Sequence, residues 1–285
     1  MAANLRAWER ASRLLQASDG RIAVHASGEV GPTILFIHGN SSCKEVFVHQ
    51  FDALKGSGYH LLALDLPGHG LSDNARTPKQ TYSFPGYAQI VREVLDELDV
   101  GRVCVVGWSL GGHIGLELLA SCSKVEALLI TGTPPIEPGP KALFEAFVRS
   151  PAMNLAGKRE FSDEDVRRYA AATLGDRDRV PPFLLRNMRR THGDARFWML
   201  RNGLAGHGMN ARRLVETDPR PLAILHGTHD PFVDLAYLNS VSYRNLWRGS
   251  VQLIEEAGHA PFWENPRDFN SLLLCFLAET IVLPG

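Results

Sequence analysis

The sequence predicts an α/β fold in which helices flank a mostly parallel central sheet. Short apolar runs alternate with helical patterns along the chain, and most of these runs end in a polar or glycine-rich loop. Apolar runs of strand length are typical of parallel strands that are buried on both faces. In such sheets the functional groups gather beyond the carboxyl ends of the strands, so the loops after these runs are the first place to look for chemistry.

The elements follow in a regular order. The expected strands are Arg21–Ala26, Thr33–Ile37, His60–Leu64, Arg102–Val106, Val125–Thr131, Leu222–Leu225 and Val251–Ile254. The expected helices between them are Val46–Lys55, Tyr87–Leu98, Leu110–Ala120, Leu235–Asn245 and Asp268–Thr280. Strands that alternate with helices in this way indicate an open parallel sheet wrapped by helices.

One long segment breaks this alternation. Between Glu137 and Arg220 there is no good strand pattern, only helical patterns such as Lys141–Val148, Ser162–Thr173 and Ala195–Leu204. We therefore expect a helical cap over residues 136–220, inserted between strands of a core domain formed by residues 1–135 and 221–285.

The overall composition is that of a soluble globular protein. The 285 residues include 30 basic and 31 acidic side chains, and 45% of the residues are hydrophobic. This balance excludes a disordered tail or a collagen-like fibre and argues against nucleic acid as a partner. The charge is unevenly divided, because Gly139–Arg220 holds 16 basic and 10 acidic residues and the rest of the chain holds 14 and 21. One explanation is that the basic cap and the acidic remainder of the chain have complementary surfaces that hold the cap in place. The more specific hypothesis is that arginines of the cap favour the capture or release of an anionic product.

Nothing in the sequence predicts a membrane or secretory protein. The first 16 residues lack a continuous apolar segment and hold several arginines, and the apolar stretch Leu272–Leu283 is interrupted by Glu279 and too short to span a bilayer. The four cysteines form no C-x-x-C pair. We therefore expect a cytoplasmic protein, with an arginine-rich transit peptide as the less favoured interpretation.

The strongest catalytic signal is Gly107-Trp108-Ser109-Leu110-Gly111, which follows an expected strand and opens an expected helix. A serine hydroxyl becomes a useful nucleophile when it is exposed, aimed and placed beside a base. A sharp strand-to-helix turn exposes it and leaves room only for small residues two positions before and after it. The two glycines meet this demand, and the context is that of a nucleophile elbow. A serine that merely begins a helix is the plainer alternative.

A base and an acid occur in the places that this elbow requires. His259 lies in the loop after the last expected strand, and Asp230 lies in the loop after the preceding strand. The chain order Ser109, Asp230, His259 differs from the orders of the two common serine protease families. Asp234 is a weaker candidate for the acid, since an aspartate there would also suit the start of a helix.

The oxyanion formed by serine attack needs preorganised N–H donors. One donor should be a backbone N–H beside the nucleophile, from Leu110 by default or from Trp108. The other should come from the loop after Thr33–Ile37, where we expect the N–H of Asn40.

Other reactive residues have plainer interpretations. His226 and His229 beside Asp230 do not supply three converging metal ligands, so we expect no metal and no cofactor. Asp65 is a conceivable epoxide-hydrolase nucleophile, but it precedes a Pro-Gly turn and more readily hydrogen-bonds that turn. The cap contains side chains that suit either an acyl pocket or its own core: Phe144, Phe147, Met153, Phe183, Met188, Phe197, Trp198 and Met209.

At these residues the sequence resembles the α/β-hydrolase superfamily, and within it the metal-free N-acyl-homoserine lactone hydrolases, the quorum-quenching lactonases of bacteria. The resembling stretches are HGNSS at 38–42, DLPGHGLS at 65–72, GWSLGGHIGLELL at 107–119, LLITGTPP at 128–135, FSDEDVRRYA at 161–170 and AGHAPF at 257–262. The resemblance implies an α/β-hydrolase fold, Ser109 as nucleophile, His259 as base and the N–H groups of Asn40 and Trp108 as oxyanion donors. It further implies that Tyr169 hydrogen-bonds the substrate. The acid is aspartate here where the family can use glutamate.

These inferences predict a serine hydrolase that opens the lactone ring of N-acyl-homoserine lactones through an acyl-enzyme, with a small-molecule substrate as its partner. A general carboxylesterase for small acyl esters would use the same residues. A ligand receptor built on a hydrolase fold is the alternative from another class. The sequence does not indicate the acyl-chain length or the oligomeric state.

Overall fold

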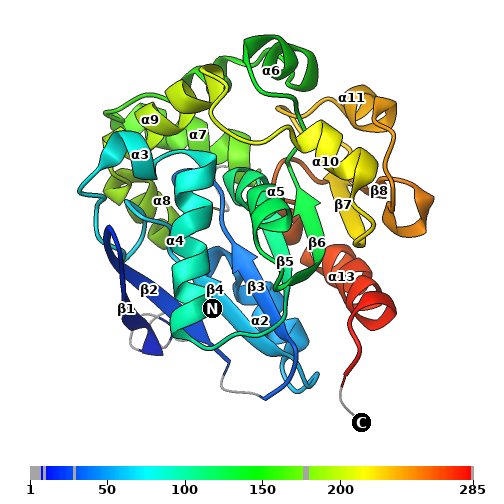
Figure 1. Cartoon of the computed structure of the whole chain (residues 1–285). Coiled ribbons are helices and arrows are strands. Elements are labelled where there is room, and N and C mark those ends of the chain that lie inside the picture. Colours follow the sequence, from blue (N-terminus) through cyan, green and yellow to red (C-terminus); the bar gives the residue numbers. More distant parts are fainter. Residues whose placement is uncertain (1–7, 9–10, 28–29, 176–179, 284–285) are drawn as a thin grey trace.

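The computed structural model describes residues 8, 11–27, 30–175 and 180–283. Over these residues one sheet runs through the molecule with the strand order β1-β2-β4-β3-β5-β6-β7-β8 (Figure 1). Its strands are β1 (Arg13–Ala17), β2 (Gly20–Ala26), β3 (Thr33–Ile37), β4 (His60–Leu64), β5 (Val103–Trp108), β6 (Val125–Thr131), β7 (Leu222–Gly227) and β8 (Gln252–Ile254). β1, β2 and β4 pair antiparallel, and all pairs from β4 to β8 are parallel. The predicted α/β fold with a mostly parallel sheet is confirmed.

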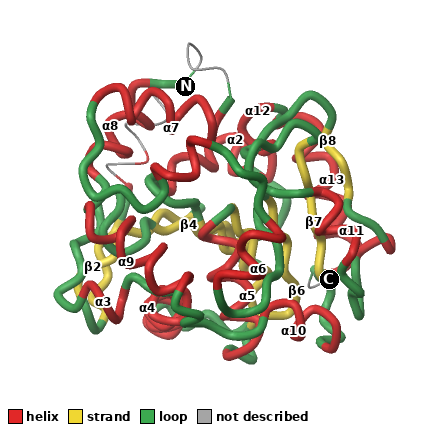
Figure 2. The backbone as a smooth tube through the Cα atoms, turned by 90° about the horizontal axis from the view of Figure 1, so that it is seen from above, coloured by secondary structure: helices red, strands yellow, loops and turns green. Residues whose placement is uncertain are grey.

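The helices cover both faces of this sheet. They are α2 (Val48–Leu54), α3 (Pro78–Thr81), α4 (Phe84–Glu97), α5 (Leu110–Ser121), α6 (Pro140–Ala146), α7 (Asp163–Leu174), α8 (Pro182–Arg190), α9 (Gly193–Leu204), α10 (Ala211–Thr217), α11 (Leu235–Ser240), α12 (Pro261–Glu264) and α13 (Pro266–Thr280). Seen from above, α4 and α5 lie on one side of the strands and α2, α12 and α13 lie on the other (Figure 2).

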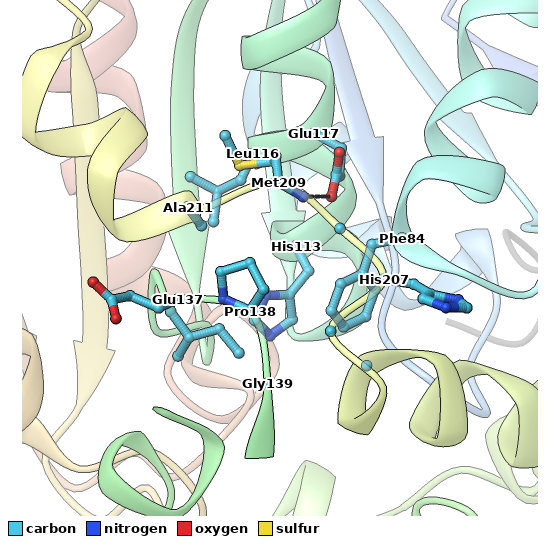
Figure 3. A pocket seen from close by; sticks show the side chains of 14 residues that line it. Phe84, His113, Leu116, Glu117, Glu137, Pro138, Gly139, His207, Met209 and Ala211 are labelled. Atoms are coloured by element: carbon cyan, nitrogen blue, oxygen red, sulfur yellow. Dashed lines mark hydrogen bonds between the residues drawn. The ribbon is translucent and has the colours of Figure 1, made fainter. Parts of the chain in front are cut away.

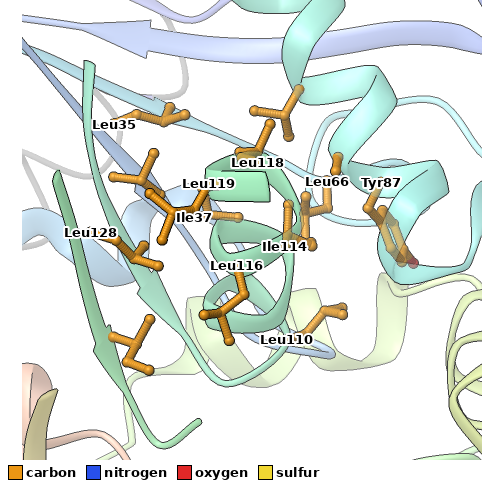
Figure 4. Packing of buried hydrophobic residues seen from close by; sticks show 14 of the residues in the cluster. Leu35, Ile37, Leu66, Tyr87, Leu110, Ile114, Leu116, Leu118, Leu119 and Leu128 are labelled. Atoms are coloured by element: carbon orange, nitrogen blue, oxygen red, sulfur yellow. The ribbon is translucent and has the colours of Figure 1, made fainter. Parts of the chain in front are cut away.

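Two hydrophobic clusters fill the space between the sheet and its helices. Successive side chains of a strand point to opposite faces, so Leu35 joins the cluster under α4 and α5 while Phe36 joins the cluster under α2 and α13. Figure 4 shows the first cluster, in which Ile114 of α5 lies on the side of that helix that faces Leu66 and Tyr87. Burial on both faces explains why β3 and β5 are apolar along their whole length.

The predicted cap segment, residues 136–220, contains α6 to α10 and lies in sequence between β6 and β7. Its helices α6, α7 and α9 gather over one end of the sheet (Figure 1). Local signals start them: α7 begins with a capping box in which the Ser162 hydroxyl accepts from the Asp165 N–H and the Asp165 carboxylate accepts from the Ser162 N–H. The division into a core domain and a cap domain at residues 136 and 220 stays a prediction.

Several elements differ from the sequence prediction, and the short helices α3, α10 and α12 were not expected. Strand β1 was not predicted, since it is a short edge strand in which only Leu15 and Ala17 are buried. Helix α8 was also missed, although prolines at 181 and 182 mark its start. The predicted helix Leu235–Asn245 was too long, because α11 ends at Ser240. None of the helices in the described part of the chain is both long and apolar enough to cross a membrane.

Candidate active site

Ser109 sits at a sharp turn between strand and helix. β5 ends at Trp108 and α5 begins at Leu110, and Ser109 between them has φ 53° and ψ −116°. Few residues other than glycine adopt a positive φ, because the conformation strains the backbone. Such strain persists where the surrounding structure enforces it, and these places are often functional sites. Here the Ser109 N–H donates to the Thr131 carbonyl of β6 at 2.9 Å, and the Ser109 carbonyl accepts from the Thr133 hydroxyl.

The two glycines of this turn are required by close contacts. A Cβ atom at Gly111 would lie 2.0 Å from the Ile37 carbonyl oxygen, and one at Gly107 would lie 2.4 Å from the Gly111 carbonyl oxygen. Both distances are far below a van der Waals contact. The prediction that this turn has space only for small residues is therefore confirmed.

His259 and Asp230 come together from the loops after β8 and β7. The His259 ring nitrogen Nδ1 lies 3.0 Å from Asp230 Oδ2 and 3.1 Å from Oδ1, and the two side chains are 4% and 1% exposed. Because an ionised carboxylate only accepts hydrogen bonds, Nδ1 carries the proton and Nε2 is left able to accept one. This is the arrangement that a general base requires.

The surroundings of Asp230 keep it ionised. Burial opposes its ionisation, but the proximity of His259, their hydrogen bond and the Phe232 N–H more than offset burial, so the pKa of Asp230 lies below its usual value. Phe232 N–H donates to Oδ1 at 2.8 Å. The other acid candidate, Asp234, instead caps α11 by accepting from the Ala236 N–H.

The loop that carries His259 is held by two residues whose roles were not predicted. The Glu264 carboxylate accepts from the N–H groups of Gly258 and Ala260, each at 3.0 Å, and so clamps the backbone on both sides of the histidine. The indole of Trp108 donates to the His259 carbonyl at 2.9 Å. A carboxylate a few residues after a candidate base is a weak signal in a sequence, because many loops contain one.

Asn40 and Tyr169 meet where the loop after β3 faces α7. The Asn40 side-chain amide donates to the Ala156 carbonyl at 2.9 Å and to the Tyr169 hydroxyl at 3.3 Å. Burial raises the pKa of Tyr169 to about 12, although the hydrogen bond from Asn40 lowers it. The phenol is therefore neutral and keeps its proton for a further acceptor.

A cavity of about 720 Å³ lies among these groups. It is lined by Asn40, Ser109, Leu110, Tyr169 and His259, so four of the predicted site side chains and one candidate oxyanion residue share one space. Asp230 lies behind His259. Trp108 does not line the cavity, because its 1% exposed side chain packs at 5.9 Å from the His259 ring.

The rest of the cavity wall is mostly apolar. It includes Phe84, Leu143, Phe144, Phe147, Val148, Met153, Met199, Leu200, Leu204 and Phe232. Of the cap side chains considered for an acyl pocket, Phe144, Phe147 and Met153 line the cavity. Phe183 and Met188 are instead buried in the hydrophobic cluster, and Phe197 packs under the Arg159 guanidinium.

Asp65 belongs to a separate buried cluster. Its carboxylate accepts from the Leu71 N–H at 2.9 Å and from Lys44 through both the N–H, at 2.8 Å, and the ammonium, at 2.9 Å. Lys44 also contacts Glu45 at 2.6 Å. The interpretation of Asp65 as a residue that hydrogen-bonds its turn is confirmed.

His226 is buried beside Asp230. His226 Nδ1 lies 4.0 Å from Asp230 Oδ2, and burial lowers the pKa of His226. In the part of the chain that the structure describes, no three histidine, cysteine or carboxylate side chains are grouped as metal ligands.

Comparison with known proteins gives the family. Residues 34–272 match the alpha/beta hydrolase family. The solved structure of the N-acyl homoserine lactonase AidH complexed with N-butanoyl homoserine is 39% identical, with a TM-score of 0.91, and the match covers 96% of this chain and 98% of that one. A 2-hydroxy-6-oxononadienedioate/2-hydroxy-6-oxononatrienedioate hydrolase of Pseudomonas sp is 28% identical over 92% of this chain and 93% of the relative.

An esterase, RhEst1 from Rhodococcus sp. ECU1013, has a similar fold, with a TM-score of 0.78 at 22% identity over 95% of this chain and 99% of that one. The strained turn at Ser109, the parallel sheet and these matches agree with one another. The chain belongs to the alpha/beta hydrolase family.

Proposed function

We propose that this hydrolase is a serine hydrolase that opens the lactone ring of N-acyl-homoserine lactones. The observation that carries the proposal is the strained Ser109, which lines one cavity together with a His259 ring oriented by Asp230. Further support comes from the 39% identity to AidH, an N-acyl homoserine lactonase. The substrate is thus a small acyl lactone, and no step of the reaction requires a cofactor.

The roles of the three residues follow from their protonation. His259 Nε2 takes the proton of the Ser109 hydroxyl as the oxygen attacks the ring carbonyl, and Asp230 holds the ring in that tautomer and stabilises the imidazolium. Collapse of the tetrahedral intermediate breaks the ring C–O bond, and His259 returns the proton to the leaving alkoxide. Water, deprotonated by His259, then hydrolyses the acyl-enzyme and releases Ser109.

The oxyanion would be held by backbone N–H groups of Asn40 and of a residue beside Ser109. Leu110 is the first residue of α5, and the first N–H groups of a helix have no acceptor within it. Trp108 is still a residue of β5 and pairs with Thr131 of β6. Helix geometry therefore supports Leu110 as the donor, and the Trp108 N–H stays the alternative.

Tyr169, on α7, would hydrogen-bond the substrate in the cavity. Its hydroxyl accepts from Asn40 and retains a proton to donate. In a lactonase the leaving hydroxyl stays attached to the acyl-enzyme and can re-close the ring. A phenol that holds the opened chain would give water time to enter.

A general carboxylesterase is the competing function, because it would need the same three residues. The test is to compare kcat/KM for N-hexanoyl homoserine lactone with kcat/KM for p-nitrophenyl acetate. The lactonase proposal expects a clear preference for the lactone that survives EDTA. A preference for the acetate ester would overturn it in favour of an esterase, and a loss in EDTA that zinc restores would overturn the serine mechanism. A quorum-quenching role in the cytoplasm is part of the same proposal.

A further inference from the structure

The cavity wall contains a second histidine, which the mechanism does not use. His113 lies on α5, four residues after Ser109 and therefore on the same side of the helix, about 6 Å further along its axis. The residue lines the cavity together with Ser109, and it also borders a small side pocket (Figure 3).

The His113 ring has no polar partner among the described residues. It is 9% exposed, and its close neighbours are the Phe84 ring, stacked at 4.7 Å with an interplanar angle of 9°, and the Phe147 ring at 6.4 Å. Among the other buried histidines in the described part of the chain, both nitrogens of His38 are hydrogen-bonded and His259 pairs with Asp230, whereas one nitrogen of His69 and one of His226 are enclosed without a partner. The ring nitrogens of His113 are not among these enclosed atoms, so a ligand in an adjoining pocket can hydrogen-bond them.

The side pocket is too small to supply that ligand. Its free volume is about 20 Å³, which is room for about one water molecule, whereas the cavity that also contains Ser109 measures about 720 Å³. A polar group of any substrate must therefore approach the ring from the cavity that also contains Ser109.

We propose that His113 is a specificity-determining residue, whose ring hydrogen-bonds a polar group that the substrate carries next to its scissile carbonyl. This inference rests on the proposed serine hydrolase and deepens it by naming the substrate class: α-acylamino esters and lactones. In an N-acyl-homoserine lactone the amide carbonyl is separated from the ring carbonyl by one carbon and one nitrogen. A carbonyl bound at Ser109 thus places the amide close to the next turn of α5.

The charge state of the ring fits an amide better than a carboxylate. Burial lowers the pKa of His113 to about 4, so the ring is neutral near pH 7. A neutral imidazole has one donor and one acceptor nitrogen, which suits an amide, and has no net charge to attract an anion.

The experiment uses two p-nitrophenyl esters of matched length, N-butanoylglycine p-nitrophenyl ester and p-nitrophenyl heptanoate. Only the first carries an amide beside the scissile carbonyl. For His113→Phe we expect kcat/KM to fall about tenfold or more on the amide ester, because a buried hydrogen bond is lost, and to change less than about twofold on heptanoate. His113→Gln, which keeps a donor and an acceptor, should recover part of the loss.

Controls separate specificity from structure. Phe84→Leu removes the stacked ring but leaves the hydrogen-bonding group, so it should affect both esters alike. Equal losses on both esters for His113→Phe, or no loss on either, would overturn the proposal, and His113→Leu provides a second variant if the first does not fold. Since both probes are simple esters, this outcome does not depend on lactone opening. If the enzyme does not hydrolyse lactones but His113→Phe still lowers kcat/KM selectively on the amide ester, only the lactonase proposal is refuted.

Discussion

Two buried charged clusters in this protein have different roles. The ion cluster of Lys44, Glu45 and Asp65 is no more than 5% exposed, and the pair of His259 and Asp230 is buried to the same degree. The ammonium of Lys44 is enclosed by two carboxylates, and none of the three residues lines the cavity. His259 does line it, beside a serine with a strained backbone. Burial and charge alone therefore do not identify an active site, whereas access to a cavity and a strained nucleophile do.

The largest expected effect is on kcat, when Ser109 or Asp230 is replaced. Ser109→Ala should lower kcat by about 10⁴-fold or more, as in other serine hydrolases, because the nucleophile is lost. Asp230→Asn should lower kcat by about 10⁴-fold, because it favours the wrong tautomer of His259. Kinetics on the preferred substrate check both, and full activity of Ser109→Ala would refute the mechanism.

The ion cluster should show the opposite behaviour. Lys44→Met leaves the Asp65 and Glu45 carboxylates buried without a cation, which should lower the free energy of unfolding by about 3–5 kcal/mol. The kcat of the folded fraction should stay within about twofold of the wild type, because the cluster does not reach the cavity. Urea unfolding and kinetics at low temperature measure the two quantities.

Lys124→Met is the matched control for that variant. Lys124 pairs with Asp96 at 2.6 Å, but Asp96 is 65% exposed. An exposed pair contributes at most about 1 kcal/mol, so this control should leave stability nearly unchanged. Equal effects of the two lysine substitutions would contradict the structural role of the ion cluster.

Acid should destabilise the protein through its buried neutral histidines. Burial lowers the pKa of His38 to about 4, and the Leu66 N–H donates to its Nε2, which a proton there would prevent. Between pH 6.5 and 4 the unfolded chain binds this proton and the folded chain does not, so stability falls as the pH falls. Each pKa unit between the unfolded and the folded chain corresponds to about 1.4 kcal/mol. The free energy of unfolding should therefore fall by about 3 kcal/mol between pH 6.5 and 4.

Urea unfolding at pH 7 and at pH 4.5 measures this loss. His38→Gln removes the titrating group, so the loss of unfolding free energy between the two pH values should be smaller by that contribution of His38. A wild-type stability that does not change between the two pH values would show that His38 titrates normally in the folded protein.

The smallest expected effect concerns the clamp on the His259 loop. Glu264→Gln keeps the shape of the side chain but removes its charge and one of the two oxygens that accept from the backbone, because an amide nitrogen cannot accept an N–H. We expect kcat to fall about tenfold with KM unchanged, because the loss of one hydrogen bond and of the charge on the other, together about 1–2 kcal/mol, loosens the base. Unchanged kcat would mean that Trp108 and the surrounding packing hold His259 without this clamp.

The sequence predicted the strands that are apolar throughout and the turn at Ser109, because in both cases the fold restricts the residue types within one short stretch of sequence. Continuous burial requires a continuous apolar run, and the steric contacts of Gly107 and Gly111 leave no other residue types. Edge strand β1 and helix α8 escaped prediction because only two of five and three of nine of their residues are buried, so neither has a long apolar pattern. The clamp by Glu264 and the unpartnered ring of His113 likewise depend on neighbours that only the folded chain brings together.

The most direct test of the central claim is the mass of the product formed from N-hexanoyl homoserine lactone. The account predicts one product, heavier than the substrate by one water, that acid converts back to the lactone. Release of hexanoic acid and free homoserine lactone would instead mean that the enzyme cleaves the amide, and would contradict lactone opening at Ser109.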